Sequence, residues 1–536
     1  MNKQTLPVVI ACLLALFGVQ YVVNKIYPPI PRKPRPVAVA PAVSSNSVET
    51  IQSAPIPTAG PAPVATTDRP AEQVVTLSND FVRVEITSWG GGIKSVELLK
   101  QKAVLRGPAL TLPGNAVFAI TQPDAHTVVL RGNDGVTKTL TLGTNEDYRI
   151  TGKFVVPAGA SNLLITVGTA APADAKEAPN YLNVDWQGGP KFSNRDVGKV
   201  IKRAEKKNGE NQELIRAHWV AVKSQFFVMI LSMPTNAVSV TYAPVGLPAW
   251  AGQPKSSATN GVTAVAEVPV TRAADGTGTC EFNWYAGPKD FDRLAALGQS
   301  QEEAMDFGSW MDGYSGIFGW LLLRGLNFFH ALIPSYAIAI ILVTIALKVV
   351  FWPIQAKSIE SMKAMQKFQP QVQKLKDKYK DDPQRLNQET MKLYKEHKIN
   401  PFSGCLPMLF QMPVLIAFYK VLGGNCALRG ESFLWIKDLA QPDTVAMLAG
   451  FAINPLPLLM VGSMIWQQKL TPQTGDPQQA KMMMFMPLIM LMFFYSAAAG
   501  LTLYWTLQQF LSILQQWLSL RKQRQLAPAA LASKSK

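Results

Sequence analysis

Six apolar segments constrain this chain more than any other feature of its 536 residues. The first covers residues 6–23, and five more follow in the C-terminal half, at about 336–356, 404–422, 445–467, 482–499 and 500–518. Each is close to the length that crosses a bilayer as a helix, about 20 residues. The last two are contiguous, yet one helix of about 37 residues would reach about 55 Å, against a hydrocarbon core of about 30 Å. We therefore predict a break near Tyr495–Leu501 and six membrane spans.

The first apolar segment, LPVVIACLLALFGVQYVV, has two interpretations. A cleaved signal peptide has a shorter apolar region, about 7 to 15 residues, and a small-residue cleavage site, which does not follow directly here. An uncleaved anchor over residues 1–27 is therefore favoured, with the signal peptide as the alternative. Residues 28–70 are rich in Pro, Ala, Ser and Thr and have no apolar period, so we expect an extended linker.

Residues 71–295 predict a large all-β domain. The stretch VVTLSNDFVRVEITSWGGGIKSVELL, residues 74–99, alternates apolar and polar residues and is interrupted by three glycines, as strands joined by a turn are. Further separate short strands are expected at FFVMILSM and AVSVTYAP, residues 226–233 and 237–244. Many short strands with turn signals between them favour a sandwich. Because the domain lies between two apolar segments, it must lie wholly on one side of the membrane.

Residues 296–334 form a linker followed by an amphipathic helix. The segment GIFGWLLLRGLNFFHALI, residues 316–333, places Arg324, Asn327 and His330 on one face of an otherwise apolar helix. Such a helix suits the membrane interface better than a full crossing.

Basic loops predict the orientation. Residues 357–400 have a net charge of +5, and the tail 521–536 holds five basic residues and no acid. Positive loops stay on the cytoplasmic side. Both termini are therefore expected in the cytoplasm and the β domain on the outer side of the membrane. Lys25, Arg32, Lys33 and Arg35 follow the first span and oppose this orientation, but the larger loops outweigh them.

The basic segment 357–400 predicts a cytoplasmic helical hairpin. Its first helix, residues 357–380, has an apolar face that includes Met362, Met365, Phe368 and Tyr379. Asp382 and Pro383 suit the start of the second helix, which is expected to end near His397. The charges have two interpretations, contact with anionic lipid or a docking site for ribosomal RNA or a nascent chain, and basic charge alone does not separate them.

Several function classes lack sequence support. No phosphate-binding G-x-x-x-x-G-K-[ST] motif occurs, and the four cysteines form no C-x-x-C pair. The four histidines have no metal-ligand spacing. We expect no cofactor, no metal site and no enzymatic activity.

Lys348 is a charge within the apolar stretch ILVTIALKVVFWPIQ. It lies nine residues, about 13 Å, before Lys357 at the expected cytoplasmic edge, which is too far for its side chain to reach the interface. On a lipid-facing surface a lysine costs about 2.5 to 3.5 kcal/mol. We therefore expect Lys348 to face a polar interior, with Thr344 on the same helical face.

Four motifs in the C-terminal half resemble the YidC/Oxa/Alb family of membrane-protein insertases, in the Gram-negative form with a periplasmic domain. They are NPFSGCLPMLFQMPVLIAFYKVL (400–422), FLWIKDLAQPD (433–443), QQKLTPQTGDPQQAKMMMFMPLIM (467–490) and GLTLYWTLQQFLSILQQ (500–516). The resemblance implies a core of five transmembrane helices over residues 335–520, an N-terminal anchor and a periplasmic β domain of the galactose-mutarotase supersandwich type. It also implies a hydrophilic groove that opens to the cytoplasm and the lipid.

The resemblance places the groove's central arginine at Lys348 and further groove positions at Gln411, Tyr504 and Trp505. It implies that the chain inserts nascent membrane proteins into the inner membrane and helps them fold as a chaperone, alone or with the Sec translocon. Two alternatives remain from the residues alone. A secondary transporter would use Lys348 to bind a solute, although the five helices show no internal repeat. A periplasmic binding module would depend on the β domain.

Overall fold

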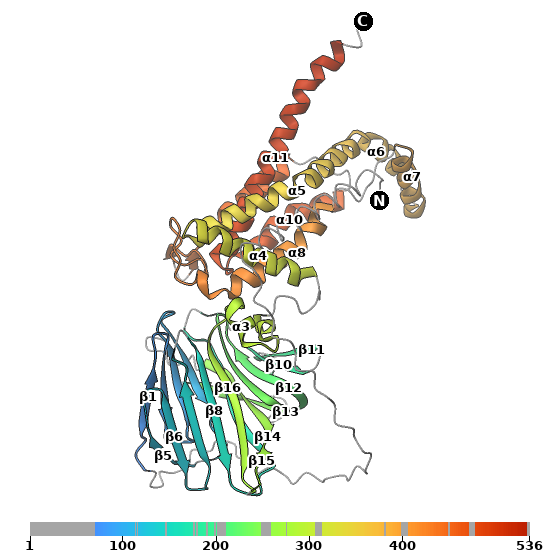
Figure 1. Ribbon diagram of the computed structural model, residues 1–536. Coiled ribbons are helices and arrows are strands. Elements are labelled where there is room, and N and C mark those ends of the chain that lie inside the picture. The colour runs from blue at the N-terminus through green and yellow to red at the C-terminus, as the bar shows by residue number, and fades with distance from the viewer. Residues whose placement is uncertain are drawn as a thin grey trace. The chain divides into compact units, whose positions relative to one another are not determined.

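The computed structural model describes residues 70–112, 116–144, 147–174, 181–188, 191–197, 211–247, 259–274, 276–305, 314–379, 382–397, 406–448, 451–470 and 477–532, with the single residues 114, 177 and 200. The predicted anchor and linker, residues 1–69, lie outside these residues. The chain divides into two compact units, one over residues 30–304 and one formed by residues 1–29 and 305–536. Figure 1 labels many of the elements in the two units.

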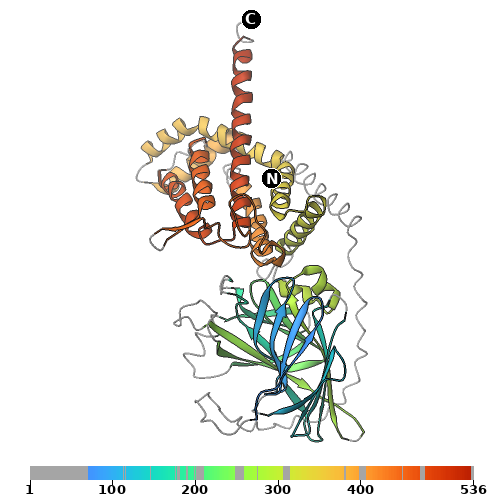
Figure 2. The same cartoon turned by 90° about the vertical axis from the view of Figure 1, so that its left-hand side faces the viewer.

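The first unit is a β sandwich, as predicted. Within its described residues, a four-stranded sheet has the order β1-β2-β3-β4, and a twelve-stranded sheet has the central order β11-β10-β12-β13-β16-β8-β7-β6-β5 with β14, β15 and β9 attached. The four strands of the smaller sheet, blue in Figure 2, are β1 (Val74–Ser78), β2 (Val82–Thr87), β3 (Gly92–Leu98) and β4 (Ala103–Ala109). The strands of the larger sheet are β5 (Phe118–Thr121), β6 (Thr127–Gly132), β7 (Thr137–Leu142), β8 (Arg149–Val156), β9 (Asn162–Ala170), β10 (Asn183–Gly188), β11 (Lys191–Asp196), β12 (Asn211–Lys223), β13 (Phe227–Leu247), β14 (Thr259–Pro269), β15 (Thr271–Arg272) and β16 (Gly278–Pro288).

One expectation about these strands is wrong. FFVMILSM and AVSVTYAP belong to a single strand, β13, which spans 21 residues. Its first part pairs with β16 and its second part with β14, while β12 follows both parts and shifts register near Ala217. The exposed middle of β13, Pro234–Asn236, resembles a turn in sequence, but pairing on both sides keeps the strand continuous.

The glycine turn after β2 is held by a buried lysine. Lys138 on β7 is fully buried, and its Nζ donates to the carbonyl oxygens of Gly90 (2.9 Å) and Gly91 (2.7 Å). Both glycines have positive φ, 71° and 56°, which the turn requires. The ammonium also lies 4.5 Å from the ring centroid of Phe118. Lys138 therefore joins the two sheets through the backbone of this turn.

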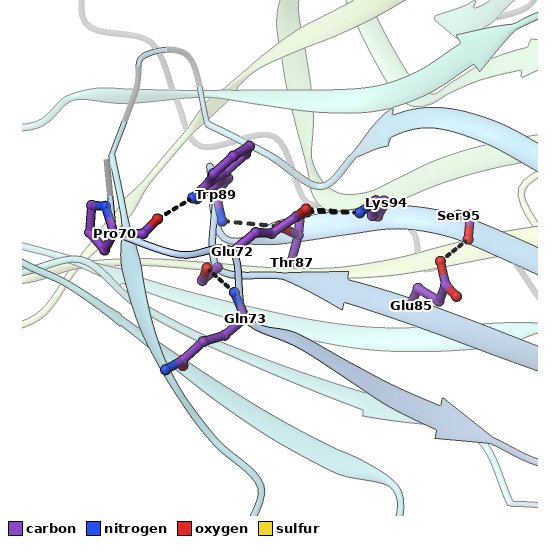
Figure 3. A network of polar contacts seen from close by, with 9 residues as sticks. Pro70, Glu72, Gln73, Glu85, Thr87, Trp89, Lys94 and Ser95 are labelled. Carbon is purple, nitrogen blue, oxygen red and sulfur yellow. Dashed lines mark hydrogen bonds and ion pairs between the residues drawn. The ribbon is translucent and has the colours of Figure 1, made fainter. Parts of the chain in front are cut away.

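A polar network fixes the edge of the smaller sheet near the start of the domain (Figure 3). Glu72 accepts from Lys94 Nζ (2.9 Å) and from Thr87 Oγ1 (2.8 Å), and the lysine and threonine bonds hold the pKa of Glu72 below its ordinary value. Trp89 Nε1 donates to the carbonyl of Pro70 (3.2 Å). These bonds attach the segment before β1 to the sheet.

The compact β unit extends beyond residue 295, where the sequence placed its end. It includes α3 (Phe291–Leu297) and most of the short helix η2 (Gln301–Met305). Trp219 Nε1 donates to the carbonyl of Gln299 (3.1 Å), and Lys223 Nζ donates to that of Ala304 (3.1 Å). Lys223 also forms a buried ion pair with Asp185 at 2.6 Å. Side chains of β12 therefore hold this segment on the sandwich.

The described part of the second unit is mainly helical. Its helices are α4 (Tyr314–Leu332), α5 (Tyr336–Lys367), α6 (Gln369–Lys378), α7 (Pro383–Glu396), α8 (Leu406–Gly424), η4 (Cys426–Leu428), α9 (Pro455–Leu470), α10 (Pro477–Phe494) and α11 (Ala499–Ala532). The α11 helix packs against α5 and α9, and α4 packs against α5 and α8. Among the described residues, one helix, Tyr336–Lys367, is long and apolar enough to cross a membrane. The chain breaks between α10 and α11 at residues 495–498, inside the stretch where the sequence predicted a break.

The helix expected over residues 445–467 begins ten residues later than predicted. A short antiparallel hairpin, β17 (Ala446–Leu448) and β18 (Phe451–Ile453), comes first, and α9 starts at Pro455. Proline suits the first turn of a helix, because the missing N–H has no partner there. Pro455 therefore marks the start of α9 and not a kink within a longer helix.

The cytoplasmic hairpin also differs from the prediction. Its first helix does not run from 357 to 380, because α5 continues to Lys367 and a break at Phe368 separates it from α6. Pro370, in the first turn of α6, has no N–H to donate to the Gln366 carbonyl four residues earlier, which interrupts the helical hydrogen bonds at this point. The second helix agrees with the prediction: the Asp382 side chain accepts from the Arg385 N–H, and α7 starts at Pro383.

Candidate functional site

Lys348 lies on α5 with only 3% of its surface exposed. Its Nζ donates to Gln355 Oε1 (2.5 Å), two turns later on α5, and to Ser512 Oγ (2.8 Å) on α11. Both acceptors are uncharged. Among the described residues, no carboxylate lies within ion-pair distance of this ammonium, so that part of the chain supplies it with no counter-charge.

A polar face of α11 lines the contact with α5. It consists of Tyr504, Gln508, Ser512, Gln515 and Ser519, spaced three or four residues apart as one face of a helix requires. Gln515 Nε2 donates to the backbone carbonyl of Trp352 (3.2 Å), and Lys363 Nζ donates to Ser519 Oγ (3.1 Å). Together with the Lys348–Ser512 bond, these contacts place hydrogen bonds along about two turns of α11 and about four turns of α5.

The third helix of the site, α8, contributes Gln411. Its Nε2 donates to the Tyr504 hydroxyl, and its Oε1 accepts from Gln508 Nε2 (3.4 Å). The Tyr504 ring is buried and stacks on Phe418, with 3.6 Å between ring centroids and 12° between planes. The Ser512 hydroxyl donates to the Gln508 carbonyl (2.8 Å), which links this pair to Lys348.

Two predicted site residues lie outside this network. Thr344 is fully buried, and its hydroxyl donates to the Ile340 carbonyl of its own helix (2.6 Å). Trp505 faces Phe494, with 5.6 Å between ring centroids, and its buried Nε1 has no hydrogen-bond partner among the described residues. The structure therefore brings Lys348, Gln411 and Tyr504 together, while Thr344 and Trp505 form no side-chain hydrogen bond with them.

Six polar residues of the network were not identified from the sequence: Gln355, Lys363, Gln508, Ser512, Gln515 and Ser519. Four of them lie on α11, within the sequence YWTLQQFLSILQQWLS, where polar residues recur at helical spacing in an apolar segment. That spacing was a usable signal. Gln355 gave none, because a glutamine near the predicted end of a span is ordinary.

The predicted apolar face of the cytoplasmic hairpin is half-buried. Met362 and Met365 lie on the extension of α5, and Tyr379 follows α6. Phe368 lies against His397 at the end of α7, with 4.2 Å between ring centroids. The aromatic contact ties the break after α5 to the end of the second hairpin helix.

Two family models match the chain. Residues 110–321 match the YidC periplasmic domain, and residues 328–525 match the 60Kd inner membrane protein family. A membrane protein insertase YidC of Maridesulfovibrio salexigens is 30% identical over 573 aligned positions, which cover 97% of this chain and 99% of the relative. This chain belongs to the YidC family. It is a membrane protein insertase of the inner membrane, with a periplasmic β domain, and it acts on nascent membrane proteins.

A second YidC relative and two solved structures are also similar to parts of this chain. The membrane protein insertase YidC of Pelobacter propionicus is 46% identical over 236 residues, which cover 43% of each chain. A solved structure of an active YidC insertase with its first transmembrane domain resolved covers 83% of this chain and 93% of its own, at 18% identity and a TM-score of 0.35. A galactose mutarotase related enzyme from Lactobacillus acidophilus covers 40% of this chain and 97% of its own, at 12% identity and a TM-score of 0.27. The supersandwich type of the β domain stays a prediction.

Proposed function

We propose that the polar residues between α5, α8 and α11 form the hydrophilic groove through which this insertase receives the polar tail of its substrate. The observation that supports the proposal is Lys348, a buried ammonium whose described partners are an amide and a hydroxyl. Burying a charge without a counter-charge is costly, and proteins rarely retain one without a role. An acidic substrate tail would supply the missing counter-charge.

Lysine in place of the family's arginine limits what the groove can do. An ammonium is a compact point charge, whereas a guanidinium grips a carboxylate through two parallel hydrogen bonds. Lys348 therefore attracts an acidic tail without fixing its geometry. Weak, adaptable attraction suits a site that must release each substrate into lipid.

We further propose that α5, α8, α9, α10 and α11 are the five transmembrane helices of the insertase core, in addition to the N-terminal anchor. The basic hairpin of α6 and α7 and the basic tail support a cytoplasmic location for both termini. The same basic residues are candidates for contact with anionic lipid and with a translating ribosome. The Sec translocon remains a proposed partner.

In this mechanism the substrate's polar tail enters the groove from the cytoplasm and is attracted by Lys348. Gln411, Tyr504 and Gln508 offer hydrogen bonds that replace those the tail had with water. The apolar segment of the substrate moves along lipid-facing helices, where Met484 and Met492 of α10 are exposed and adaptable. Transfer of this segment into lipid releases the substrate. No covalent step is required.

Insertion into proteoliposomes tests the proposal. Single-span substrates with an acidic or an uncharged tail would be compared in wild type, Lys348→Arg and Lys348→Glu, with Lys367→Glu, an exposed position on the same helix, as the matched control. Two unit charges 4 Å apart interact by about 4 kcal/mol at an effective dielectric constant of about 20. Since about 1.4 kcal/mol corresponds to a factor of ten, Lys348→Glu should slow insertion of the acidic-tailed substrate at least about tenfold.

The uncharged tail separates an electrostatic role from a structural one. In Lys348→Glu, insertion of the substrate with the uncharged tail should fall far less than insertion of the acidic-tailed substrate. Lys348→Arg and Lys367→Glu should stay close to wild type with both substrates. Equal losses for the two tails would show that Lys348 supports packing and not recognition. Equal insertion by all variants would overturn the groove proposal.

A further inference from the structure

The β17–β18 hairpin exposes large apolar side chains at the protein surface. Met447, Leu448 and Phe451 have exposed fractions of 66%, 67% and 77%. From residue 444 to residue 468 the sequence contains no charged residue. A surface of this kind in water is a liability for aggregation or marks an interaction site.

The apolar side chains cover both faces of the hairpin. Leu448 pairs with Phe451 across the two strands, so these two side chains lie on one face, while Met447, one position earlier, lies on the other. A hairpin that docks on another protein buries one face and leaves the other polar. Apolar residues on both faces indicate an apolar medium on both sides.

The base of the hairpin is polar and fixed. The Thr444 hydroxyl donates to Asn454 Oδ1 (2.7 Å), and Asn454 Nδ2 donates to the Tyr495 carbonyl (2.7 Å). Asp443 Oδ2 accepts from the Leu456 N–H at the start of α9 (2.7 Å) and from Trp435 Nε1 (3.2 Å). The chain therefore changes within a few residues from a hydrogen-bonded base to strands with only apolar side chains.

A further exposed apolar residue, Leu434, lies in the turn beside this base. Leu434 is exposed and has φ of 53°, a conformation that leucine rarely adopts. A backbone hydrogen-bond pair between Phe433 and Ile436 holds the turn. Trp435 follows directly, and its bond to Asp443 joins the turn to the hairpin base. Tryptophan, with an apolar ring and an Nε1–H that donates a hydrogen bond, is typical of the bilayer interface.

We propose that the β17–β18 hairpin, with Leu434 and Trp435, inserts into the headgroup and upper acyl region of the bilayer and anchors the start of α9 there. Each strand has three residues, which is too short to recruit a substrate strand by edge pairing. The outer edges of the two strands require hydrogen bonds from water or headgroups, because unpaired backbone groups do not occur in the hydrocarbon core. The hairpin therefore contacts lipid at the membrane interface. The inference concerns lipid contact alone and does not depend on the proposed groove or orientation.

Fluorescence quenching in the full chain tests this inference. An environment-sensitive fluorescent amino acid would replace Leu448 in one variant and Met447, on the opposite face, in a second. Leu214 on β12, 87% exposed in the β domain, is the matched control. These side chains are largely exposed, so the label displaces little packing. The protein would be reconstituted into vesicles of phosphatidylethanolamine and phosphatidylglycerol and exposed to aqueous iodide or to lipids that bear a doxyl group near the headgroup or near the chain end.

We expect both hairpin labels to be quenched by iodide several-fold less than the label at 214, and more strongly by the shallow doxyl lipid than by the deep one. Iodide quenching equal to that at 214 would place the hairpin in water. Protection from iodide without quenching by doxyl lipid would show that protein covers it. Lipid contact for only one of the two labels, or stronger quenching by the deep doxyl lipid, would also overturn the proposal.

Discussion

Replacing Lys138 with methionine tests how a buried amine stabilises the β domain. Burial lowers the pKa of Lys138 from its ordinary value of 10.5 to about 7, against the attraction of Asp134. The unfolded chain therefore binds the proton more tightly than the folded domain between these two values. The free energy of unfolding then rises with pH, by about 2 kcal/mol between about pH 7 and about pH 9.

The methionine variant loses both the bonds and the pH dependence. The Gly90 and Gly91 carbonyls lose their Lys138 donor, and each unsatisfied buried acceptor costs about 1 to 3 kcal/mol. At about pH 7 we expect the free energy of unfolding of Lys138→Met to be about 2 to 6 kcal/mol lower than that of wild type. At about pH 9 this gap between the two proteins should be about 2 kcal/mol wider. Other groups titrate in both proteins, so their contribution cancels in the difference.

Pulse proteolysis in urea measures this difference on the detergent-solubilised full chain, because cleavage reports the unfolded fraction of the β domain. The reasoning would be refuted if the stability gap between wild type and Lys138→Met were the same at the two pH values. An unchanged gap would show that the buried amine stays protonated up to about pH 9.

Two further predictions use the same assay. Asp185→Leu leaves Lys223 buried without its carboxylate and should lower the free energy of unfolding by about 3 to 5 kcal/mol. The Asp185→Leu/Lys223→Met double variant should recover much of that loss. A double variant no more stable than the single one would contradict a net cost from the unpaired charge. Gly152→Ala should destabilise the β domain by about 1 to 3 kcal/mol, because the new Cβ would lie 2.0 Å from Phe282 Cζ. Gly246→Ala, where no atom lies within 4 Å of the new Cβ, should be nearly neutral, and equal effects of the two substitutions would reject the packing argument.

The sequence predicted the parts of this protein that follow from local pattern. Alternation in β2, where Val82, Val84 and Ile86 are buried, identified a strand, and Asp382–Pro383 identified the start of α7. The break between α10 and α11 followed from bilayer thickness. Each of these predictions depends on residues close together in the chain.

Features that depend on tertiary contact were missed or misplaced. The β17–β18 hairpin is uncharged and apolar, so its residues resemble the start of a spanning helix, and only Pro455 signalled the true beginning of α9. The long strand β13 stays continuous through pairing with strands on both sides, which its own residues do not reveal. Lys348 was recognised as unusual, but its partner Ser512 lies 164 residues away and becomes evident only when α5 packs on α11.

Photo-crosslinking from α11 to a substrate stalled during insertion tests the central claim most directly. A photoreactive residue at Ser512, beside Lys348, should capture the acidic tail of the substrate, whereas one at Leu514, exposed on another face of the same helix, should capture its apolar segment or lipid. Capture of the tail from Leu514 as strongly as from Ser512 would contradict a polar groove between α5, α8 and α11.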